Sequence, residues 1–233
     1  MNASLLIARR ELRGGLRGFG VFLACLILGV AAIAAVGSVR VAIQEGLTRE
    51  GAAILGGDAE MEFTYRFANE TERAWMDNAA LEVSEIVDFR SMAVVDQGGV
   101  TERALTQVKA VDDIYPIYGE TILEPAMPLK DALAITDTRG AVAEQTLLYR
   151  LGIAVGDSIK LGENSIESRA FLRREPDTSN AGFSFGPRVL VLQDALDGSG
   201  LITEGTLFET DYRLRLPPET NLETLSEVAK EEF

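Results

Sequence analysis

Carboxylates are the only abundant side chains in this sequence that could carry out chemistry. The 233 residues include 36 Asp and Glu against 22 Lys and Arg, which gives a formal net charge of −14. Pairs such as Asp112-Asp113 and Glu231-Glu232 could serve a carboxylate-only glycosidase or hold a calcium ion. Chance pairs are frequent at this acidic content, and the EF-hand pattern is absent. We therefore interpret the acidic residues as solvated surface, and the sequence predicts no catalytic, cofactor-binding or metal-binding residue.

The sequence lacks the residues that most other catalytic and binding sites need. The sequence contains no His, which removes Ser-His-Asp triads and His-containing metal sites. Its single Cys, Cys25, allows no intrachain disulfide and no C-x-x-C pair. The phosphate-binding pattern G-x-x-x-x-G-K-[ST] is absent, so we expect ATP to be hydrolysed elsewhere. A strongly acidic chain also lacks the cationic face that nucleic acid requires. These observations predict a protein that is not an enzyme and binds no nucleic acid.

One long apolar segment lies near the start of the chain. Residues 18–39 carry no charge, and as a helix they would extend roughly 33 Å at about 1.5 Å per residue. The hydrocarbon core of a bilayer is about 30 Å thick, so this segment predicts one transmembrane helix. A cleavable signal peptide is the alternative, because the small residues at 34–38 resemble a cleavage site. We favour a retained anchor, since the apolar part of a signal peptide is shorter.

The charges on the two sides of this segment predict its orientation. Residues 1–18 have four Arg and one Glu, whereas residues 19–233 have 18 basic and 35 acidic side chains. Because Lys and Arg stay in the cytoplasm, we expect a cytoplasmic N-terminus and an extracytoplasmic, or periplasmic, body. Residues 1–17 also have the pattern of an amphipathic basic helix that lies in the lipid interface. The predicted topology residues are Arg9, Arg10, Arg13, Arg17 and Arg40.

The remainder of the chain predicts a stalk and a mixed α+β domain. Apolar residues at helical spacing favour a stalk helix over 40–57, which ends at Gly56-Gly57-Asp58. Residues 59–67 alternate as a half-buried strand. Thr71 is expected to cap a helix that holds Ala74, Trp75 and Leu81. Further predicted elements are a hairpin of 85–95 with 100–111, a helix at 143–151 ended by Gly152, a hairpin of 157–161 with 165–173, strands at 189–192 and 206–216, and a helix capped by Thr220 or Asn221.

Three segments of this sequence resemble a known family of membrane proteins. They are ARRELRGGLRGFGVFLACLILGVAAIAAVGSV (8–39), ILGGDAEMEF (54–63) and GAVAEQTLLYRLGIAVGDSIKLG (140–162). Together they resemble the start of bacterial ABC-transporter permeases of the MacB/FtsX type, and more narrowly the large two-repeat permeases found near lysophospholipase genes. The third segment contains Leu151-Gly152 followed by Gly156-Asp157-Ser158-Ile159, a pattern that recurs in the extracytoplasmic core domain of that family.

The resemblance implies an inner-membrane permease subunit with a MacB-type periplasmic core domain over 58–233. It implies an ABC ATPase subunit as partner, which binds the ATP, and contact with membrane lipid. A second permease half or an extracytoplasmic protein are further implied partners. Transport by this family serves export, or the handling of lipids and lipoproteins. The family has three later spans that this sequence lacks, so we expect an N-terminal fragment with an incomplete core domain.

Two other functions stay open at this point. The chain could be a single-pass, membrane-anchored binding or assembly module outside the cytoplasm. It could also be a secreted hydrolase after signal cleavage, for which a mature N-terminus near Ser38 would be expected. The family resemblance favours the permease.

Overall fold

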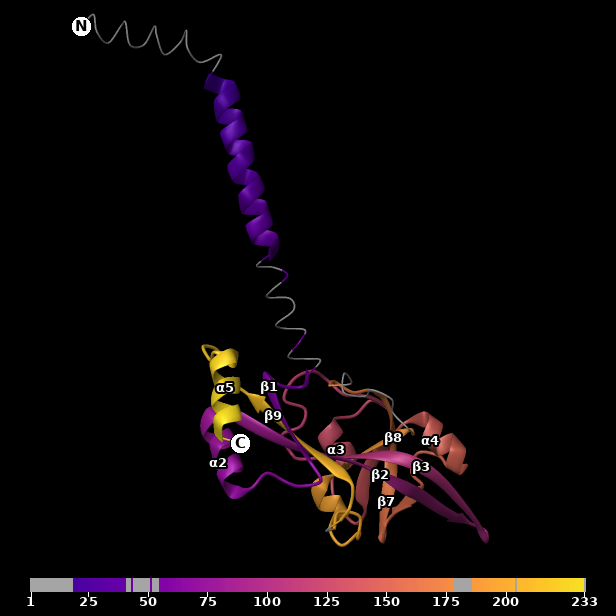
Figure 1. Cartoon of the computed structure of the whole chain (residues 1–233). Helices are drawn as coiled ribbons and strands as arrows, with labels where there is room; N and C mark the ends of the chain where they lie inside the picture. The colour runs from indigo at the N-terminus through magenta and orange to yellow at the C-terminus, as the bar shows by residue number, and fades with distance from the viewer. Residues whose placement is uncertain are drawn as a thin grey trace, which may run out of the picture. The chain divides into compact units, whose positions relative to one another are not determined.

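The computed structural model describes residues 19–40, 43, 51, 55–177, 186–203 and 205–232 (Figure 1). The chain divides into two compact units, Met1–Glu50 and Gly51–Phe233, which we describe separately. Arg9, Arg10, Arg13 and Arg17, together with most of the predicted stalk, lie outside the described residues.

The described part of the first unit is a long apolar helix. It extends over Phe19–Arg40, 22 residues, and all its side chains are exposed. Among the described residues this is the one helix that is long and apolar enough to cross a membrane. Apolar side chains that are exposed throughout the described helix fit an apolar solvent, which a bilayer supplies. The predicted apolar helix is therefore confirmed, with bounds shifted by one residue.

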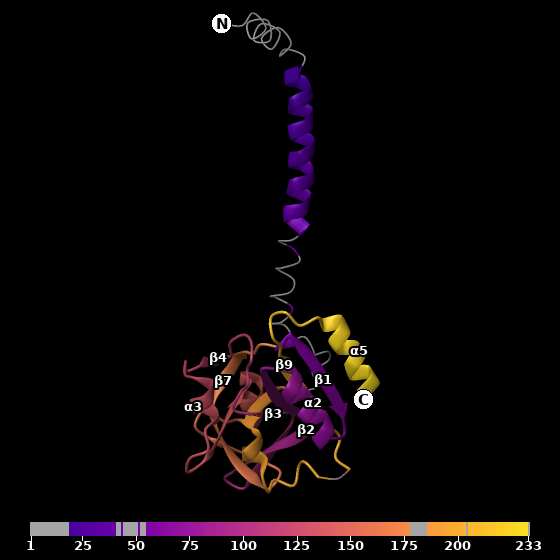
Figure 2. The same ribbon diagram turned by 90° about the vertical axis from the view of Figure 1, so that its left-hand side faces the viewer.

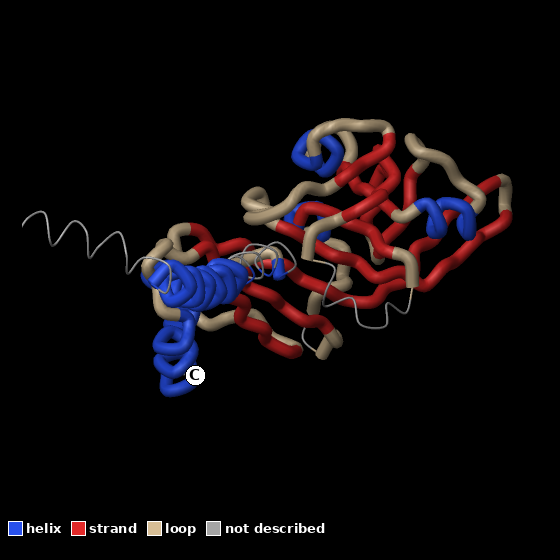
Figure 3. The backbone as a smooth tube through the Cα atoms, turned by 90° about the horizontal axis from the view of Figure 1, so that it is seen from above, coloured by secondary structure: helices blue, strands red, loops and turns tan. Residues whose placement is uncertain are grey.

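The second unit is a mixed α+β domain, as predicted (Figure 3). Strands form most of it, and short helices lie at its margins. The strands are β1 (Ala59–Thr64), β2 (Glu82–Gln97), β3 (Val100–Val111), β4 (Ile122–Glu124), β5 (Arg139–Ala143), β6 (Ser158–Leu161), β7 (Asn164–Arg174), β8 (Arg188–Leu192) and β9 (Phe208–Arg215). The helices are α2 (Glu70–Ala79), α3 (Leu129–Leu133), α4 (Gln145–Leu151) and α5 (Leu222–Glu232), with a 3₁₀ turn at Gln193–Leu196.

Six of these strands close into a ring. The main order is β1-β9-β2-β3-β8-β5-β7-β4, and β6 pairs with both β2 and β7. The pairs β2–β3, β3–β8, β8–β5, β5–β7, β7–β6 and β6–β2 therefore form a closed circuit. The pairs β3–β8 and β5–β7 are parallel, and the other four pairs are antiparallel. Closure removes free edges from these strands and leaves β1 and β9 as an extension on one side.

The largest apolar cluster includes residues of all six ring strands. It contains Val108, Ile159, Leu161, Ile166 and Val189, together with the apolar side chains of α4. A second cluster packs α3 against the same sheet. A third packs α2 against β1 and β9 through Met76, Phe63 and Tyr212. The β1–β9 part therefore has an apolar cluster of its own, which reaches the ring strand β2 through Val83.

Several local predictions are confirmed. β2 and β3 form the expected hairpin, with Gly98 and Gly99 both at positive φ in the turn. Helix α4 ends at Gly152, whose φ of 66° and ψ of 30° place it in the left-handed region that favours glycine. Asn221 caps the last helix, because its side-chain oxygen accepts from the amides of Glu223 and Thr224.

Two local predictions are wrong. β1 ends at Thr64, because Tyr65 has a φ of 62° and turns the chain out of the sheet. Tyr65 and Phe67, which we expected to face inward, are 59% and 41% exposed. The N-cap of α2 is Asn69 rather than Thr71, since Asn69 and Glu72 form a capping box. Leu81 lies beyond this helix and is 60% exposed.

Candidate functional site

The start of β1 and the end of β9 meet at one place. Asp58 lies just before β1, and its amide donates to the carbonyl of Leu214 near the end of β9 at 2.8 Å. Asp58 Oδ2 accepts from the Leu216 amide at 2.8 Å and from the Tyr118 hydroxyl at 2.9 Å. The Asp58 carboxylate thus joins the start of β1, the end of β9 and the connection formed by residues 112–121. We call this set, Asp58, Tyr118 and Leu216, the Asp58 junction.

The two glycines before Asp58 are required by close packing. A Cβ on Gly56 would lie 2.8 Å from the Cβ of Asp177, and Gly56 has a φ of 76°. A Cβ on Gly57 would lie 3.0 Å from the carbonyl of Ala59. The sequence Gly56-Gly57-Asp58 was expected only to end a helix, whereas it also allows the chain to approach the buried segment that holds Asp177.

Asp177 is the centre of a buried ionic cluster. Its side chain is 1% exposed, and it accepts from Lys109 Nζ at 2.8 Å and from the Tyr115 hydroxyl at 2.9 Å. Lys109, on β3, is only 3% exposed. Burial lowers the pKa of Lys109 against the attraction of Asp177, and it raises the pKa of Tyr115. Asp177 is therefore the nearer of the two carboxylates that pair with the buried lysine, and the second is Glu175 at 3.8 Å.

Two arginines extend this cluster through further ion pairs. Arg188 on β8 pairs with Glu175, and both side chains are less than 10% exposed. Arg213 on β9 pairs with Glu60 and with Asp211, and it lies 3.9 Å from Asp177. These contacts fix the segment before residue 178 onto three strands of the sheet.

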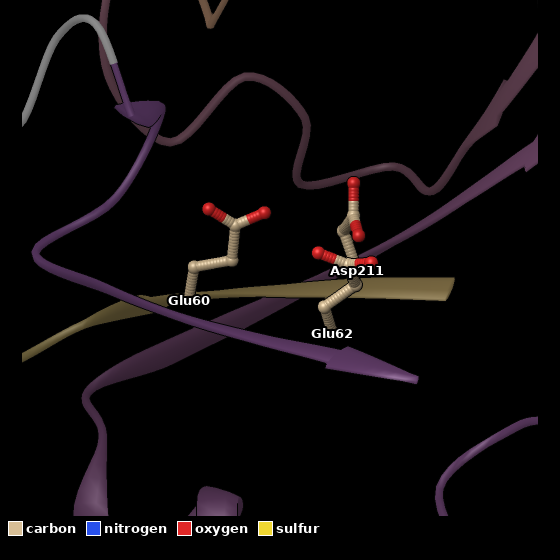
Figure 4. A group of neighbouring side chains, drawn as sticks. All are labelled: Glu60, Glu62 and Asp211. Atoms are coloured by element: carbon tan, nitrogen blue, oxygen red, sulfur yellow. The ribbon is translucent and has the colours of Figure 1, made fainter. Parts of the chain in front are cut away.

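A row of carboxylates crosses β1, β9 and β2 beside this cluster. The strand register places Glu62 opposite Asp211, and Glu209 opposite Asp88. Oxygens of Glu60, Glu62 and Asp211 lie within 4.8 Å of one another and project from the same side of the strands (Figure 4). A hollow of about 250 Å³ is bounded by this row and by Lys109, Arg188 and Arg213. We call Glu62, Asp211, Glu209 and Asp88 the acidic row.

Two members of the acidic row, Asp211 and Glu209, have raised pKa values. Burial raises the pKa of Asp211 to about 7, and the charges of Glu60, Asp88 and Glu62 add to this against the attraction of Arg213. Burial, followed by repulsion from Glu62 and Asp88, also raises the pKa of Glu209. Like charges directly opposite one another in a sheet are destabilising. The row is therefore a place where the folded domain holds protons near neutral pH.

This titration predicts that the domain loses stability as pH rises. The folded pKa of Asp211 lies above its ordinary value of 3.8, so its stabilisation is complete below about pH 4 and is lost as pH rises through about 7. One pKa unit corresponds to about 1.4 kcal/mol, and solvent screens part of the effect. We expect Asp211→Asn to stabilise the domain by roughly 2 kcal/mol at pH 8 and to flatten its pH dependence. Chemical unfolding at pH 5 and pH 8 measures this, and an unchanged dependence would contradict it.

An apolar groove lies next to the Asp58 junction. It has a volume of about 530 Å³ and extends between β1 and α5. These two elements lie side by side in both views of the domain (Figures 1 and 2). Leu222 and Leu225 come from α5, and Trp75 comes from α2. Leu225 packs on the same apolar cluster as Phe63 and Leu214, which fixes the amphipathic helix against the sheet.

Among the residues predicted to set topology, only Arg40 is described. It is the last residue of the apolar helix, where a cation would meet the lipid headgroups. The Asp58 junction, the buried cluster and the acidic row were all missed by sequence reasoning. The sequence contained a signal for the buried ionic cluster, because Lys109 interrupts the apolar residues Val108, Ala110 and Val111 at the end of a strand.

No protein-family model matches this chain. Its sequence is 28% identical over 192 residues to "Uncharacterized ABC transporter permease YbbP" of Escherichia coli (strain K12). That match covers 81% of this chain and 22% of the relative, so the chain spans about a fifth of the length of the relative it matches.

Two solved structures have a similar arrangement. The extracellular domain of the noncanonic ABC-type transporter YknZ from Gram-positive bacteria has a TM-score of 0.44 at 11% identity, with 71% of this chain and 78% of that one covered. The periplasmic region of MacB from Actinobacillus actinomycetemcomitans has a TM-score of 0.47 at 9% identity, with 77% and 85% covered. The sequence similarity to YbbP agrees with the predicted resemblance to bacterial ABC-transporter permeases.

Proposed function

We propose that this chain is the N-terminal part of a permease subunit in the cell (inner) membrane. The observation that carries the proposal is the 28% identity over 192 residues to an ABC transporter permease. In this proposal the Phe19–Arg40 helix crosses the bilayer, the N-terminus is cytoplasmic, and residues 40–233 are extracytoplasmic. ATP hydrolysis by a partner subunit drives export, or the handling of lipids or lipoproteins.

The Asp58 junction supports a mechanical role for the domain. Because Asp58 joins the start of β1 to the end of β9, a displacement of either segment acts on the same pair of strands. The buried ionic cluster ties those strands to β3 and β8 through Lys109, Arg188 and Arg213. A force applied at the Asp58 junction would therefore move the whole domain together. This is the property that relay of an ATP-driven motion requires.

Partners follow from the same proposal. An ABC ATPase subunit binds the ATP, and this chain itself needs no cofactor. Membrane lipid surrounds the apolar helix. A second permease half, or an extracytoplasmic protein, completes the assembly.

Co-purification with the ATPase tests the proposal. The complete reading frame that contains this sequence would be tagged and expressed with candidate ABC ATPase subunits of the same organism, then solubilised in mild detergent. We expect the ATPase to co-purify and its turnover to depend on the permease. Asp58→Ala should keep the complex but uncouple the ATPase, whereas Asp77→Ala on the exposed face of α2 serves as the matched control. Failure of the ATPase to co-purify would contradict the permease role and favour an anchored binding module.

A further inference from the structure

Strand β1 has an outer edge that no described strand covers. In the sheet order it pairs only with β9. The Tyr65 amide donates to the Phe208 carbonyl at 2.8 Å, and the register continues as Thr64 opposite Glu209. Along an antiparallel strand, the main-chain N–H and C=O groups of successive residues point alternately toward the paired strand and away from it. Tyr65 bonds toward β9, so Thr64 and Glu62 direct their main-chain N–H and C=O groups to the outer edge.

The apolar groove follows this edge. It is lined by six consecutive residues, Asp58 to Phe63. Successive side chains of a strand point to opposite faces, so a hollow that touches all six lies along the strand edge rather than on one face. The far wall is α5, with Leu222 and Leu225, and Trp75 contributes from α2. A single extended polypeptide would therefore have main-chain partners on one side and apolar side chains on the other.

The two faces of β1 differ in chemistry, and they specify the occupant. Met61 and Phe63 belong to the apolar cluster that Leu225 contacts. Glu62 lies on the other face of β1 and is the first residue of the acidic row. The strand register pairs it with Asp211 of β9. Glu62 itself is exposed. A cation placed beside Glu62 by a neighbouring strand would offset the repulsion within the row, because opposite charges across strands are stabilising.

A second copy of this chain does not satisfy these conditions. Pairing of β1 with its own copy would place Glu60 and Glu62 beside the same acidic residues of the other strand. Directly opposed like charges destabilise a sheet, and charged edge strands commonly prevent such pairing. The complementary occupant is therefore a different sequence with positive charge.

We propose that β1 accepts an extended segment of another polypeptide as an additional strand, with apolar side chains toward α5 and Lys or Arg beside Glu62. Main-chain hydrogen bonds provide affinity, and the alternating side chains provide specificity. This binding is independent of the transport role, since it uses only the edge of β1, the groove and the acidic row.

Binding of a model peptide tests this inference. The probe is a capped ten-residue peptide of alternating Val and Lys, added to the full chain in uncharged detergent micelles. Trp75 is the single tryptophan and lines the groove, so its fluorescence reports occupancy. We expect a saturable change with the Val–Lys peptide and none with an alternating Val–Glu peptide. Equal responses to both peptides, or no response to either, would overturn the charge argument.

A charge reversal on the protein separates specific from general attraction. Glu62→Lys should weaken binding of the Val–Lys peptide at least tenfold and allow the Val–Glu peptide to bind. Glu62 is exposed, so the variant should fold. Glu102→Lys, at an exposed position of β3, makes the same change in net charge and should leave affinity within twofold. An equal loss in both variants would show attraction to the acidic surface as a whole.

Main-chain pairing is tested on the peptide itself. Two Val–Lys peptides would carry N-methyl groups on alternate residues, one along each edge of the strand. An added strand uses a single edge toward β1, so one of the two peptides should bind as the parent does and the other should lose at least tenfold. If both lose affinity equally, or both retain it, strand addition is wrong.

Discussion

Replacing Asp177 with alanine should lower the free energy of unfolding of the domain by about 3–5 kcal/mol, the largest stability effect that we expect from a single substitution. The change leaves Lys109, which is 3% exposed, without the carboxylate at 2.8 Å. Burial already lowers the pKa of this lysine, so losing its partner would favour the neutral form further. Chemical unfolding followed by Trp75 fluorescence measures the loss.

Two controls distinguish a buried-charge effect from general damage. Asp77→Ala breaks a surface ion pair with Arg73 in which Asp77 is 55% exposed, and it should change stability by less than about 1 kcal/mol. Adding Lys109→Met to Asp177→Ala should recover much of the loss, because it removes a buried charge whose remaining carboxylate, Glu175, lies 3.8 Å away. A double variant whose loss equals the sum of the two single losses would contradict this account of the cluster.

Replacing Arg9, Arg10, Arg13 and Arg17 with Glu should invert the chain in the membrane in most molecules. The flank before the apolar helix would then carry five acidic residues in place of a net charge of +3, and the feature that retains it in the cytoplasm would be lost. A reporter fused after residue 60, active only outside the cytoplasm, should lose most of its activity.

The matched control replaces the same four residues with Lys. It keeps the positive charge and should preserve the original orientation, since Lys and Arg act alike in this rule. If the Glu variant keeps full reporter activity, these arginines do not set the topology.

Local features of this fold could be predicted because short segments specify them. The uncharged residues 18–39 indicated the apolar helix, and the glycines at 98, 99 and 152 marked a turn and a helix end. Asn221 was recognised as a cap because its side chain bonds to amides within three residues. Each of these depends on backbone preferences or apolar periodicity over a few positions.

Long-range features were not predictable from one sequence. The hairpin of β6 with β7 was predicted from local sequence, but the ring closes because β6 also pairs with β2, and no local pattern specifies that partner. The buried cluster joins Lys109 to Asp177 across 68 positions. The Asp58 junction joins residues 158 positions apart. An isolated Lys in an apolar strand suggests a buried partner, but only the fold identifies which carboxylate supplies it.

The predicted strand over 59–67 shows how a local exception misleads. Its alternation is regular through Phe67, yet Tyr65 adopts a positive φ and ends the strand early. The hydrophobic pattern alone does not reveal this, because Tyr65 and Phe67 fit the apolar face by type. Their exposure became evident only from the backbone geometry.

Cysteine accessibility tests most directly whether the domain lies outside the cytoplasm. In a Cys25→Ser background, Ser165→Cys, an exposed position in β7, would be compared with Ser4→Cys near the N-terminus. Sealed spheroplasts would be treated with a maleimide that does not cross membranes. Our account predicts labelling of Ser165→Cys before lysis and of Ser4→Cys only after it. Protection of Ser165→Cys until lysis, or recovery of the whole chain in the soluble fraction, would contradict the account.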